Sequence, residues 1–486
     1  MKKLFIPISA FLLLGSCSVL DKEPLTSIAP SNFFVSAVDA EAALAATYDG
    51  LQQKGAYAEV LPLLGNMPTD DCTSLNNDVR NLDVINWNSG TGQIYDAYRD
   101  AYVAINRANA VIKYVPGINM PAARRDEIVG EARFVRALSY FNLVRLYGGV
   151  PLRLEPSESG DPAAINLPRS TPDQVYAQVI EDLIQAEGLM AAVNPTRATK
   201  GAADALLARV YLTQRQWDAA QMAAAKVFTS GGTFSLSPSY NSVFPADNKS
   251  ESIFEVQFSG NTDGGTFHTL PDLVLPQPPA TYSFQKFNIP TTNLLQAADT
   301  VNDQRWSFQG RVNAGRNHAS YVQGQSRNDN DNDNGPFVYK WRSDPNGFNS
   351  PDNSYILRVA DVLLMQAEAS NELSGPSAGA LTPLNRVRQR AGLSALTTSS
   401  PAAASKQALR SEIDLQRRLE LAFEGERWFD LLRYARHNQA EAGAHKVSAL
   451  TLIQQFRGTP DPNYLLLPLP LAELDTNTQL QQNPGY

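Results

Sequence analysis

Residues 412–434 read EIDLQRRLELAFEGERWFDLLRY, and this stretch decides the fold. Apolar side chains in its first half recur at spacings near 3.6 residues, which predicts a helix; they are Ile413, Leu415, Leu419, Ala422 and Phe423. Gly425 can end or bend that helix. The pattern then restarts at the spacing of a buried helical face, at Trp428, Leu431, Leu432 and Ala435. We therefore predict two helices that pack on one another.

Charged residues fill the positions between these apolar ones. They are Arg417, Arg418, Glu420, Glu424, Glu426, Arg427, Asp430 and Arg433. Opposite charges three or four residues apart can pair along a helix. Glu420 and Glu424 also lie one turn apart, and paired carboxylates are the acid and base of many glycosidases. Because arginines flank both, we interpret the two glutamates as members of a structural ion-pair ladder.

The run RRLELAFEGERWFDLLRY at 417–434, here called the signature stretch, resembles the C-terminal signature of the SusD/RagB family. Three other phrases resemble family segments in the same order: YVAINRANAVI at 102–112, EARFVRALSYFNLVRLYGGVPL at 131–152 and LLLPLPLAELDTNTQLQQNPGY at 465–486. Members of that family are surface lipoproteins that bind nutrients, mostly glycans, for outer-membrane transporters. The resemblance is weak at 55–92 and 232–354, and these are the regions that would determine ligand specificity.

Helical periodicity recurs along much of the chain, at 37–53, 93–115, 124–152 and 172–190. The stretch 200–231 carries small and aromatic residues at tetratricopeptide offsets, and 355–373 with 377–391 makes another helix pair. We predict an all-α dominated fold, in which a tetratricopeptide-like scaffold of about four helix pairs carries an irregular, loop-rich lobe with short strands. One strand candidate lies at 253–258.

The N-terminus predicts a lipid anchor. Lys2 and Lys3 precede an apolar run at 4–14, which is too short to span a bilayer and fits a secretory signal. The run ends in Leu-Gly-Ser before Cys17, the pattern of a cysteine that receives diacylglycerol. We expect a signal peptide at 1–16, lipidation of Cys17 and a tether at 17–30, which predicts an outer-membrane, cell-surface location. A plain signal peptide that contains a cysteine is the alternative.

We expect the rest of the chain, 31–486, to form a single domain. Its helical repeats would cover 37–231 and 355–437, its ligand-side lobe 232–354, and an extended C-terminal segment 438–486. Over the whole chain, 41 basic against 49 acidic residues give a net charge of −8 without a basic run, which argues against nucleic acid as a partner. Cys72 is the only cysteine besides Cys17, so the fold is not a disulfide scaffold.

Ligand-binding side chains should lie outside the packed helices. Aromatic planes match the C–H faces of sugars, and Asp, Asn and Arg match their hydroxyl groups. Trp217 and Trp428 fall at repeat-core positions and are excluded. The resemblance implies aromatic residues from the first loop, 62–92, and from the irregular lobe, with acidic residues of the first loop nearby. The predicted ligand-binding residues are Trp87, Trp306, Tyr321, Trp341, Tyr282, Asp70 and Asp71; local packing is the alternative for each tryptophan, above all for Trp341.

Cofactor chemistry has little support in the sequence. Asp329, Asp331 and Asp333 alternate with asparagine as in a calcium loop, but the expected glycine and glutamate of that loop are missing. A solvated turn is favoured there, and a structural calcium stays open. The chain has no HExxH or CxxC motif for zinc. We expect no catalytic residue and no other cofactor.

The resemblance predicts a protein that binds an oligo- or polysaccharide and delivers it to a SusC-like TonB-dependent transporter, over which it acts as a lid. Peptide binding, as in RagB-like members, is the first alternative. Two alternatives belong to other classes: a helical-repeat scaffold that binds only protein, and a surface glycoside hydrolase, for which we find no convergent catalytic site.

Overall fold

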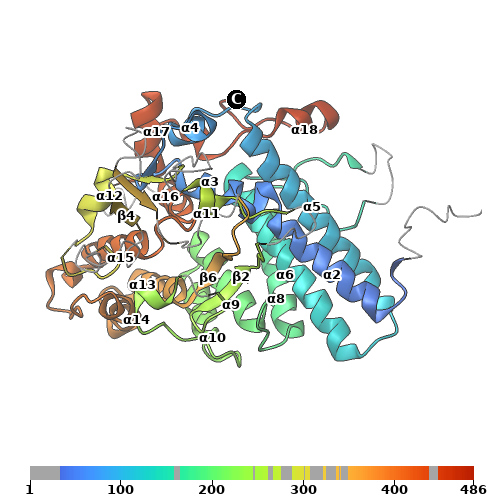
Figure 1. The fold of residues 1–486 in the computed structure, drawn as a ribbon, viewed down its shortest axis with the longest axis horizontal. Helices are drawn as coiled ribbons and strands as arrows, with labels where there is room; N and C mark the ends of the chain where they lie inside the picture. The colour runs from blue at the N-terminus through green and yellow to red at the C-terminus, as the bar shows by residue number, and fades with distance from the viewer. Residues whose placement is uncertain are drawn as a thin grey trace, which may run out of the picture.

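The structure is a computed structural model. It describes residues 33–157, 165–244, 247–260, 266–274, 287–299, 301–306, 321–324, 335–338, 340, 348–436 and 447–486. Helices dominate these residues, and the strands form three short two-stranded sheets (Figure 1). The predicted fold class, a helix-pair scaffold with an irregular lobe, is confirmed. None of the described helices is long and apolar enough to cross a membrane.

Four long helices build the N-terminal half: α2 (Ala37–Gln52), α5 (Gly92–Tyr114), α6 (Ala122–Tyr147) and α8 (Pro172–Leu189). Each packs on the next, and α6 is buried over most of its C-terminal part. Capping boxes start α2 at Ser36 and α8 at Thr171, where each side chain accepts a backbone N–H that the helix leaves unpaired. The periodicity of the sequence predicted these helices to within two residues at most ends.

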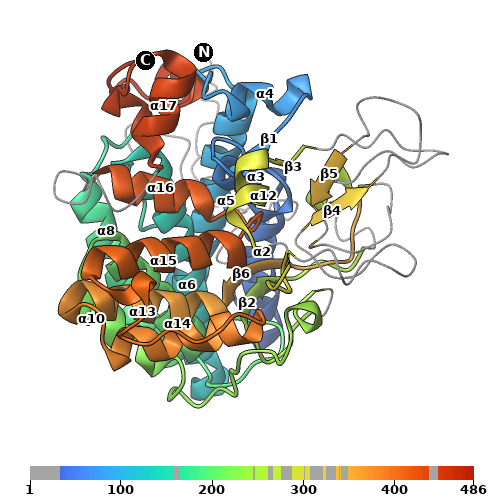
Figure 2. The same cartoon turned by 90° about the vertical axis from the view of Figure 1, so that its left-hand side faces the viewer.

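The helix array continues without a break into the C-terminal half. Helices α9 (Lys200–Thr213) and α10 (Trp217–Lys226) form the predicted repeat unit, and α10 packs on α13 (Val359–Ser374). In turn, α13 packs on α14 (Ala378–Arg390) and on α15 (Lys406–Glu420). Segments more than 130 residues apart in the chain thus stack as neighbours, as the contact of α10 with α13 shows in Figure 2.

The signature stretch forms the end of α15, a turn, and α16 (Arg427–Arg436), and these two helices were predicted. They pack chiefly on other elements, α15 on α13 and α16 on α3 (Val60–Asn66) and α17 (Ala449–Arg457), rather than on one another as predicted. An ion pair between Arg417 and Asp430 at 3.1 Å links them.

Phe423 and Gly425 both have positive φ in the turn between α15 and α16, +69° and +84°. The side chain of Asn66 holds this turn, since it donates to the Phe423 carbonyl at 3.0 Å and accepts from the Gly425 N–H at 2.8 Å. A Cβ at Gly65 would lie 1.9 Å from the Gly425 carbonyl oxygen, so only glycine permits this approach.

The three sheets are antiparallel. Strand β1 (Cys72–Thr73) pairs with β3 (Ile289–Pro290), β2 (Ser252–Val256) with β6 (Ser354–Arg358), and β4 (Tyr321–Gly324) with β5 (Gly335–Val338). The predicted strand near 253–258 is confirmed as β2. The prediction that a helix begins at 355 is wrong: those residues are β6, and α13 begins only at Val359. A run of aromatic and β-branched residues that is buried on both faces suits a strand as well as a helix.

The first loop and the C-terminal segment contain short helices, although the sequence predicted none there. The first loop includes α3 (Val60–Asn66) and α4 (Asn77–Asp83), and the C-terminal segment includes α17 (Ala449–Arg457) and α18 (Leu471–Thr476). Short helices α11 (Leu270–Leu273) and α12 (Thr292–Ala297) lie in the lobe. Single turns of other helix types occur at Lys54–Ala58, Val115–Gly117, Tyr240–Ser242, Pro401–Ala403 and Pro462–Leu465.

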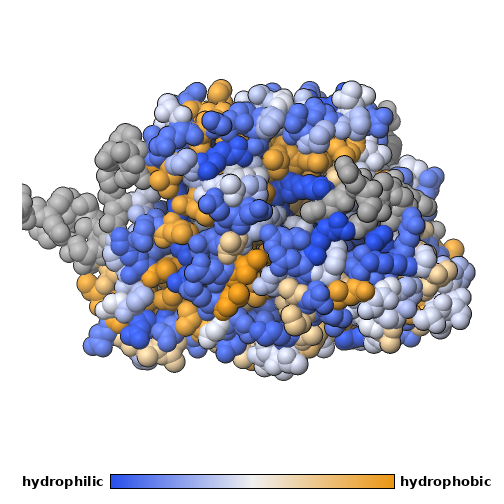
Figure 3. All heavy atoms as spheres, turned by 180° about the vertical axis from the view of Figure 1, so that it is seen from behind, coloured by the Kyte–Doolittle hydropathy of each residue, from blue (hydrophilic) through white to orange (hydrophobic). Residues whose placement is uncertain are grey.

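One large apolar core runs through both halves, and a smaller one lies where the start of α2 meets the end of α5 and the start of α6. The lobe strands β4 and β5 stand away from the helix array in Figure 2, with β1, β3 and α4 on the side facing it. The back of the molecule, in Figure 3, is largely hydrophilic, with hydrophobic side chains in small separate groups. That distribution is ordinary for a surface in contact with water.

Candidate functional site

The first loop and the irregular lobe meet at the β1–β3 pair. Cys72 lies opposite Pro290 and Thr73 opposite Ile289. The next residue, Thr291, continues the contact: its N–H donates to the Asp71 carbonyl at 2.9 Å and its hydroxyl to the Asp70 carbonyl at 2.6 Å. Two segments separated by more than 200 residues are thereby joined backbone to backbone. This is the place at which the sequence predicted a ligand site.

Two arginines of the signature stretch hold this meeting point from beneath. Arg418 donates to the Asp71 carboxylate at 2.6 Å, and also to the Asp70 carbonyl at 3.0 Å and to Asn293 in α12 at 2.8 Å. Arg427 donates to the Asp70 carboxylate at 2.9 Å. Ion pairs of this kind fix both position and orientation, because the guanidinium fork matches the carboxylate. The residues that identify the fold therefore also position the lobe against the first loop.

The expectation that Asp70 and Asp71 lie outside the packed core is wrong, and their role as ligand contacts stays a prediction that the structure does not favour. Both are buried and paired with arginine. Burial alone would raise the pKa of Asp70, but the charges of Arg427 and Arg418 outweigh it, so the pKa lies below its ordinary value. Burial raises the pKa of the Asp71 carboxyl despite Arg418. These acids serve the packing of the loop rather than its surface.

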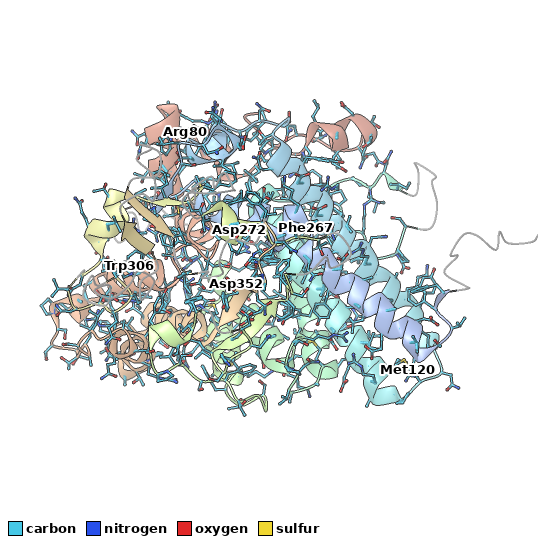
Figure 4. The ribbon with its side chains drawn as sticks, in the orientation of Figure 1. Arg80, Met120, Phe267, Asp272, Trp306 and Asp352 are labelled. Atoms are coloured by element: carbon cyan, nitrogen blue, oxygen red, sulfur yellow. The ribbon has the colours of Figure 1, made fainter. Side chains whose placement is uncertain are left out.

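The two tryptophans predicted as ligand anchors are also core residues. Trp87 is 2% exposed, its indole N–H donates to the Tyr486 hydroxyl at 2.7 Å, and its ring meets Trp428 edge-on. Trp306 is fully buried against the turn of the signature stretch, where its N–H donates to the Leu419 carbonyl at 3.3 Å (Figure 4). A buried indole that has found a hydrogen-bond partner has no face left for a sugar. The prediction that these rings lie outside the packed helices is wrong.

The other predicted residues stay untested. Tyr321 opens β4, where its backbone lies opposite Val338. Tyr282, Trp341, the lipidation site Cys17 and the aspartates Asp329, Asp331 and Asp333 lie outside the described residues. Within the described ranges, no group of three or more His, Cys, Asp or Glu side chains could hold a metal ion.

The solvent side of the meeting point is a polar row on α4 and the loop that follows it. We call it the junction face; its exposed members are Asn77, Asp78, Arg80, Asn86 and Asn88. Amide, carboxylate and guanidinium groups of this kind offer the donors and acceptors that hydroxyl-rich ligands need. The face lies at the upper edge of Figure 4, where Arg80 projects from α4.

Arg80 is fixed in place although it is half exposed. Its guanidinium donates to the Ser74 carbonyl at 2.9 Å and pairs with Asp83 one turn along α4. The Asp83 carboxylate also accepts from the Thr73 hydroxyl at 3.1 Å, which ties the helix to the end of β1. Burial raises the pKa of Asp83, against the hydrogen bonds and the Arg80 charge. The remaining donors of Arg80 are therefore presented to solvent in a set orientation.

The loop after α4 is held in a strained conformation. Ile85 has φ of +51°, which is unusual for a β-branched residue. Arg457 of α17 holds the loop, since it donates to the Ile85 carbonyl at 2.6 Å and to the Trp87 carbonyl at 3.2 Å. Asn86 and Asn88 are exposed on either side of the buried Trp87. Sequence reasoning missed this face, although the buried Val79, Leu82 and Ile85, each three residues apart, signal which side of α4 turns inward.

A second ionic centre lies in the interior, around Glu420. This carboxylate is fully buried and pairs with Arg358 at 3.0 Å, Arg305 at 3.2 Å and Arg390. Burial would raise its pKa, but the three guanidinium charges outweigh it and place the pKa well below its ordinary value. Glu424 pairs with Arg358 and with Lys340. The interpretation of the two glutamates as structural ion-pair members is confirmed, although their partners are arginines and a lysine from distant segments and not the flanking Arg417, Arg418 and Arg427.

Two family models match the chain in separate parts. The model described as "SusD family" matches residues 262–486, and the one described as "Starch-binding associating with outer membrane" matches residues 19–212. Among curated relatives, SusD-like protein P2 of Formosa agariphila is 28% identical over 522 aligned residues, with all of both chains covered. SusD-like protein P25 of the same organism is 27% identical, with 96% of each chain covered.

Solved structures share the fold across nearly the whole chain. A laminarin binding SusD-like protein superimposes with a TM-score of 0.75 and 26% identity, over 93% of this chain and 100% of that one. A SusD homolog from Bacteroides thetaiotaomicron reaches a TM-score of 0.76 at 23% identity, over 94% and 98% of the two chains. At that lower identity the likeness concerns the fold.

Proposed function

The chain belongs to the SusD/RagB family, and from this premise we propose that it binds glycan at the junction face on the cell surface and delivers it to a SusC-like TonB-dependent transporter. The observation that carries the proposal is the polar row on α4, which is exposed to solvent and fixed by the Arg80–Asp83 ion pair and by the hydrogen bond from the Thr73 hydroxyl to Asp83. A rigid polar surface loses little conformational freedom when it binds, so its hydrogen bonds favour binding directly.

Each group of the junction face has a role in this proposal. Arg80 donates to sugar hydroxyls, Asp78 accepts from them, and Asn77, Asn86 and Asn88 can do both. Aromatic stacking would come from the lobe, whose candidates are Tyr321, Tyr282 and Trp341. The bound chain would then lie in contact with both the first loop and the lobe, which meet at the β1–β3 pair.

The anchor and the partner complete the proposal. Lipidation at Cys17 would hold the protein at the outer membrane, where the family model's description places such proteins. Stacked helix pairs offer a broad surface on which a transporter can dock. Ligand would favour closure over the transporter only if it gains contacts in the closed state, because a ligand shifts an equilibrium by its differential affinity for the two states. The proposal assigns binding without catalysis.

Calorimetry on the detergent-solubilised full chain tests the ligand. Laminarin is the first probe, since one structural relative is described as binding it, and a panel of other polysaccharides and of peptides follows. Arg80→Ala should weaken glycan binding at least tenfold, equivalent to about 1.4 kcal/mol. The matched control is Arg125→Ala, which removes a partly exposed ion-paired arginine from α6 and should leave affinity unchanged.

Two results would contradict the proposal. Binding of peptides and of no glycan would replace the ligand class. Glycan binding that survives both Arg80→Ala and Asp78→Asn would move the site away from the junction face. Co-purification from solubilised outer membranes tests the partner, and the absence of a SusC-like transporter from the purified complex would remove the delivery role.

A further inference from the structure

A cavity of about 350 Å³ opens beside α5. Its walls are α5, the segment that follows α6 and the short helix α18. The volume falls within the range of about 300–1,000 Å³ that is typical of small-molecule sites. The cavity takes no part in the junction face, and its lining combines tyrosine rings with unpaired charges.

Tyr98 and Tyr102, one turn apart on α5, line the cavity with rings that are fixed in place. Their centroids lie 5.0 Å apart, and Tyr147 and Tyr140 pack edge-on against them. The Tyr102 hydroxyl donates to the Pro151 carbonyl at 2.7 Å, so its polar end is satisfied. Tyr102 is only partly buried, and its ring can therefore receive the apolar face of a ligand.

Arg153 lines the cavity as well, and the hydrogen bonds that the described residues make with it all involve its backbone. The Tyr140 hydroxyl donates to the Arg153 carbonyl at 2.8 Å and accepts from its N–H at 2.6 Å, and Asn109 donates to the same carbonyl at 2.9 Å. The guanidinium lies 6.0 Å from the centre of the Tyr102 ring. Within the described part of the chain it has no hydrogen-bond or ion-pair partner. Two other arginines of this cavity, Arg99 and Arg107, are paired with aspartates.

Glu473 of α18 provides the matching acid. It is half-buried, and the described residues supply no hydrogen bond or ion pair to its carboxylate. Burial raises its pKa, and the charge of Arg153 opposes that rise. Helix α18 is held in place at both ends, because the Leu471 N–H donates to the Ser89 carbonyl at 2.9 Å and Asn477 donates to the Leu167 carbonyl at 2.9 Å.

Among the described residues, Arg153 and Glu473 are a cation and an anion without an ion pair, and because they line one half-enclosed cavity, the ligand must suit both charges. Desolvated charges without partners cost free energy. A direct ion pair between Arg153 and Glu473 would offset that cost, but the two side chains lie farther apart than an ion pair allows. A simple anion would satisfy Arg153 and repel Glu473, and a cation would do the reverse. A neutral polyol satisfies both, since one hydroxyl accepts from Arg153 while its neighbour donates to Glu473.

We propose that the cavity between α5 and α18 is a second saccharide subsite, in which neighbouring hydroxyls bridge Arg153 and Glu473 and a C–H face rests on Tyr102. The inference rests on the proposed glycan-binding function and extends it. The Ser89–Leu471 hydrogen bond joins α18 to the same loop that carries Asn86 and Asn88 of the junction face. Both α4 and α18 lie along the upper edge of Figure 1, and the proposal includes one long glycan that occupies both sites.

Occupation of two sites by one chain raises the effective concentration at the second site. Long laminarin chains should therefore bind more tightly than a trisaccharide, by a factor that depends on Arg153 and Glu473. The test is calorimetry on the full chain with laminaritriose and with laminarin, for the wild type, for the double variant Arg153→Met with Glu473→Gln, and for Arg80→Ala. Glu155→Gln is the control, because Glu155 is an exposed acid on the same segment and does not line the cavity.

The expected result is two trisaccharide sites in the wild type and one in each of the two altered proteins. Laminarin affinity should fall at least tenfold in the double variant and stay unchanged in Glu155→Gln, with equal melting temperatures throughout. Since the described residues give neither Arg153 nor Glu473 an ion pair or a side-chain hydrogen bond to lose, the double variant should fold normally. A crystal of the full chain soaked with laminaritriose should show the sugar against Tyr102.

Other outcomes overturn the inference. One trisaccharide site that Arg80→Ala abolishes and the double variant retains would refute the second subsite and leave the proposed function standing. Binding of triglycine, and of no sugar, at Arg153 and Glu473 would replace the saccharide by a zwitterionic ligand. Failure of every glycan in the panel would refute the proposed function together with the inference that rests on it.

Discussion

The buried centre around Glu420 and the junction face around Arg80 are built from the same side-chain types, arginine with aspartate or glutamate, yet they serve opposite ends. Glu420 is enclosed by Arg305, Arg358 and Arg390. The Arg80 guanidinium donates to the Ser74 carbonyl and pairs with Asp83, and its other N–H groups face solvent. Residue type alone therefore does not show whether a charged side chain stabilises the fold or can bind a ligand. What matters is whether the side chain has donors or acceptors that no other protein group uses.

The largest effect should come from breaking the buried centre. Glu420→Gln leaves three buried guanidinium groups without their shared charge, and we expect a loss of about 3–5 kcal/mol in the free energy of unfolding. Urea unfolding monitored by circular dichroism measures it. Asp78→Asn on the junction face is the control and should change stability by less than about 0.5 kcal/mol. Equal effects of the two substitutions would erase the contrast between the two regions.

Asp204 in α9 sharpens the comparison, because it is buried without a strong partner. Both carboxylate oxygens lack a hydrogen bond, Lys226 lies 3.7 Å away, and burial raises the pKa to about 6. The folded state therefore binds more protons than the unfolded state between the unfolded pKa near 3.8 and about 6.

Stability should consequently fall as pH rises through that window, by roughly 1–3 kcal/mol, and level off above it. Asp204→Asn should remove this slope. Urea unfolding at a series of pH values from 4 to 7 provides the measurement. Glu420 should give a pH dependence of the opposite sign, because its pKa is lower in the folded state. Its contribution to the free energy of unfolding is present above its unfolded pKa and is lost as the pH falls. Identical pH profiles of the wild type and Asp204→Asn would show that the Asp204 carboxyl is not perturbed.

A smaller effect is expected from Trp87→Phe, which tests whether Trp87 is a core residue or a ligand contact. Trp87→Phe removes the hydrogen bond to Tyr486 and part of the packing on Trp428, and should destabilise the fold by about 1–2 kcal/mol. Glycan affinity of the folded protein should stay within a factor of two of the wild type. Trp217→Phe, a half-exposed tryptophan of α10, is the matched control for stability. Weaker glycan binding with unchanged stability would restore Trp87 as a ligand contact.

Local sequence determined the scaffold. Helical periodicity, capping residues and the small-residue pattern of 200–231 placed α2, α5, α6, α8, α9 and α10, since these signals act over a few residues and report which face of a helix is apolar. The strand β2 was predicted on the same basis. One misplaced boundary is at β6, where an apolar run suits either structure, and pairing with β2 about 100 residues earlier decides it.

The sequence alone thus determined the fold class, the helix array and the ionic nature of the signature stretch. Only the tertiary structure decided which polar and aromatic residues remain available for a ligand. Arg418 donates to Asp71 across 347 residues of chain, and Trp87 donates to Tyr486 across 399 residues. The sequence near Asp71 or Trp87 therefore does not predict that either side chain is buried. The physical reason is that a side chain's free hydrogen-bonding capacity is what remains after distant partners have packed against it.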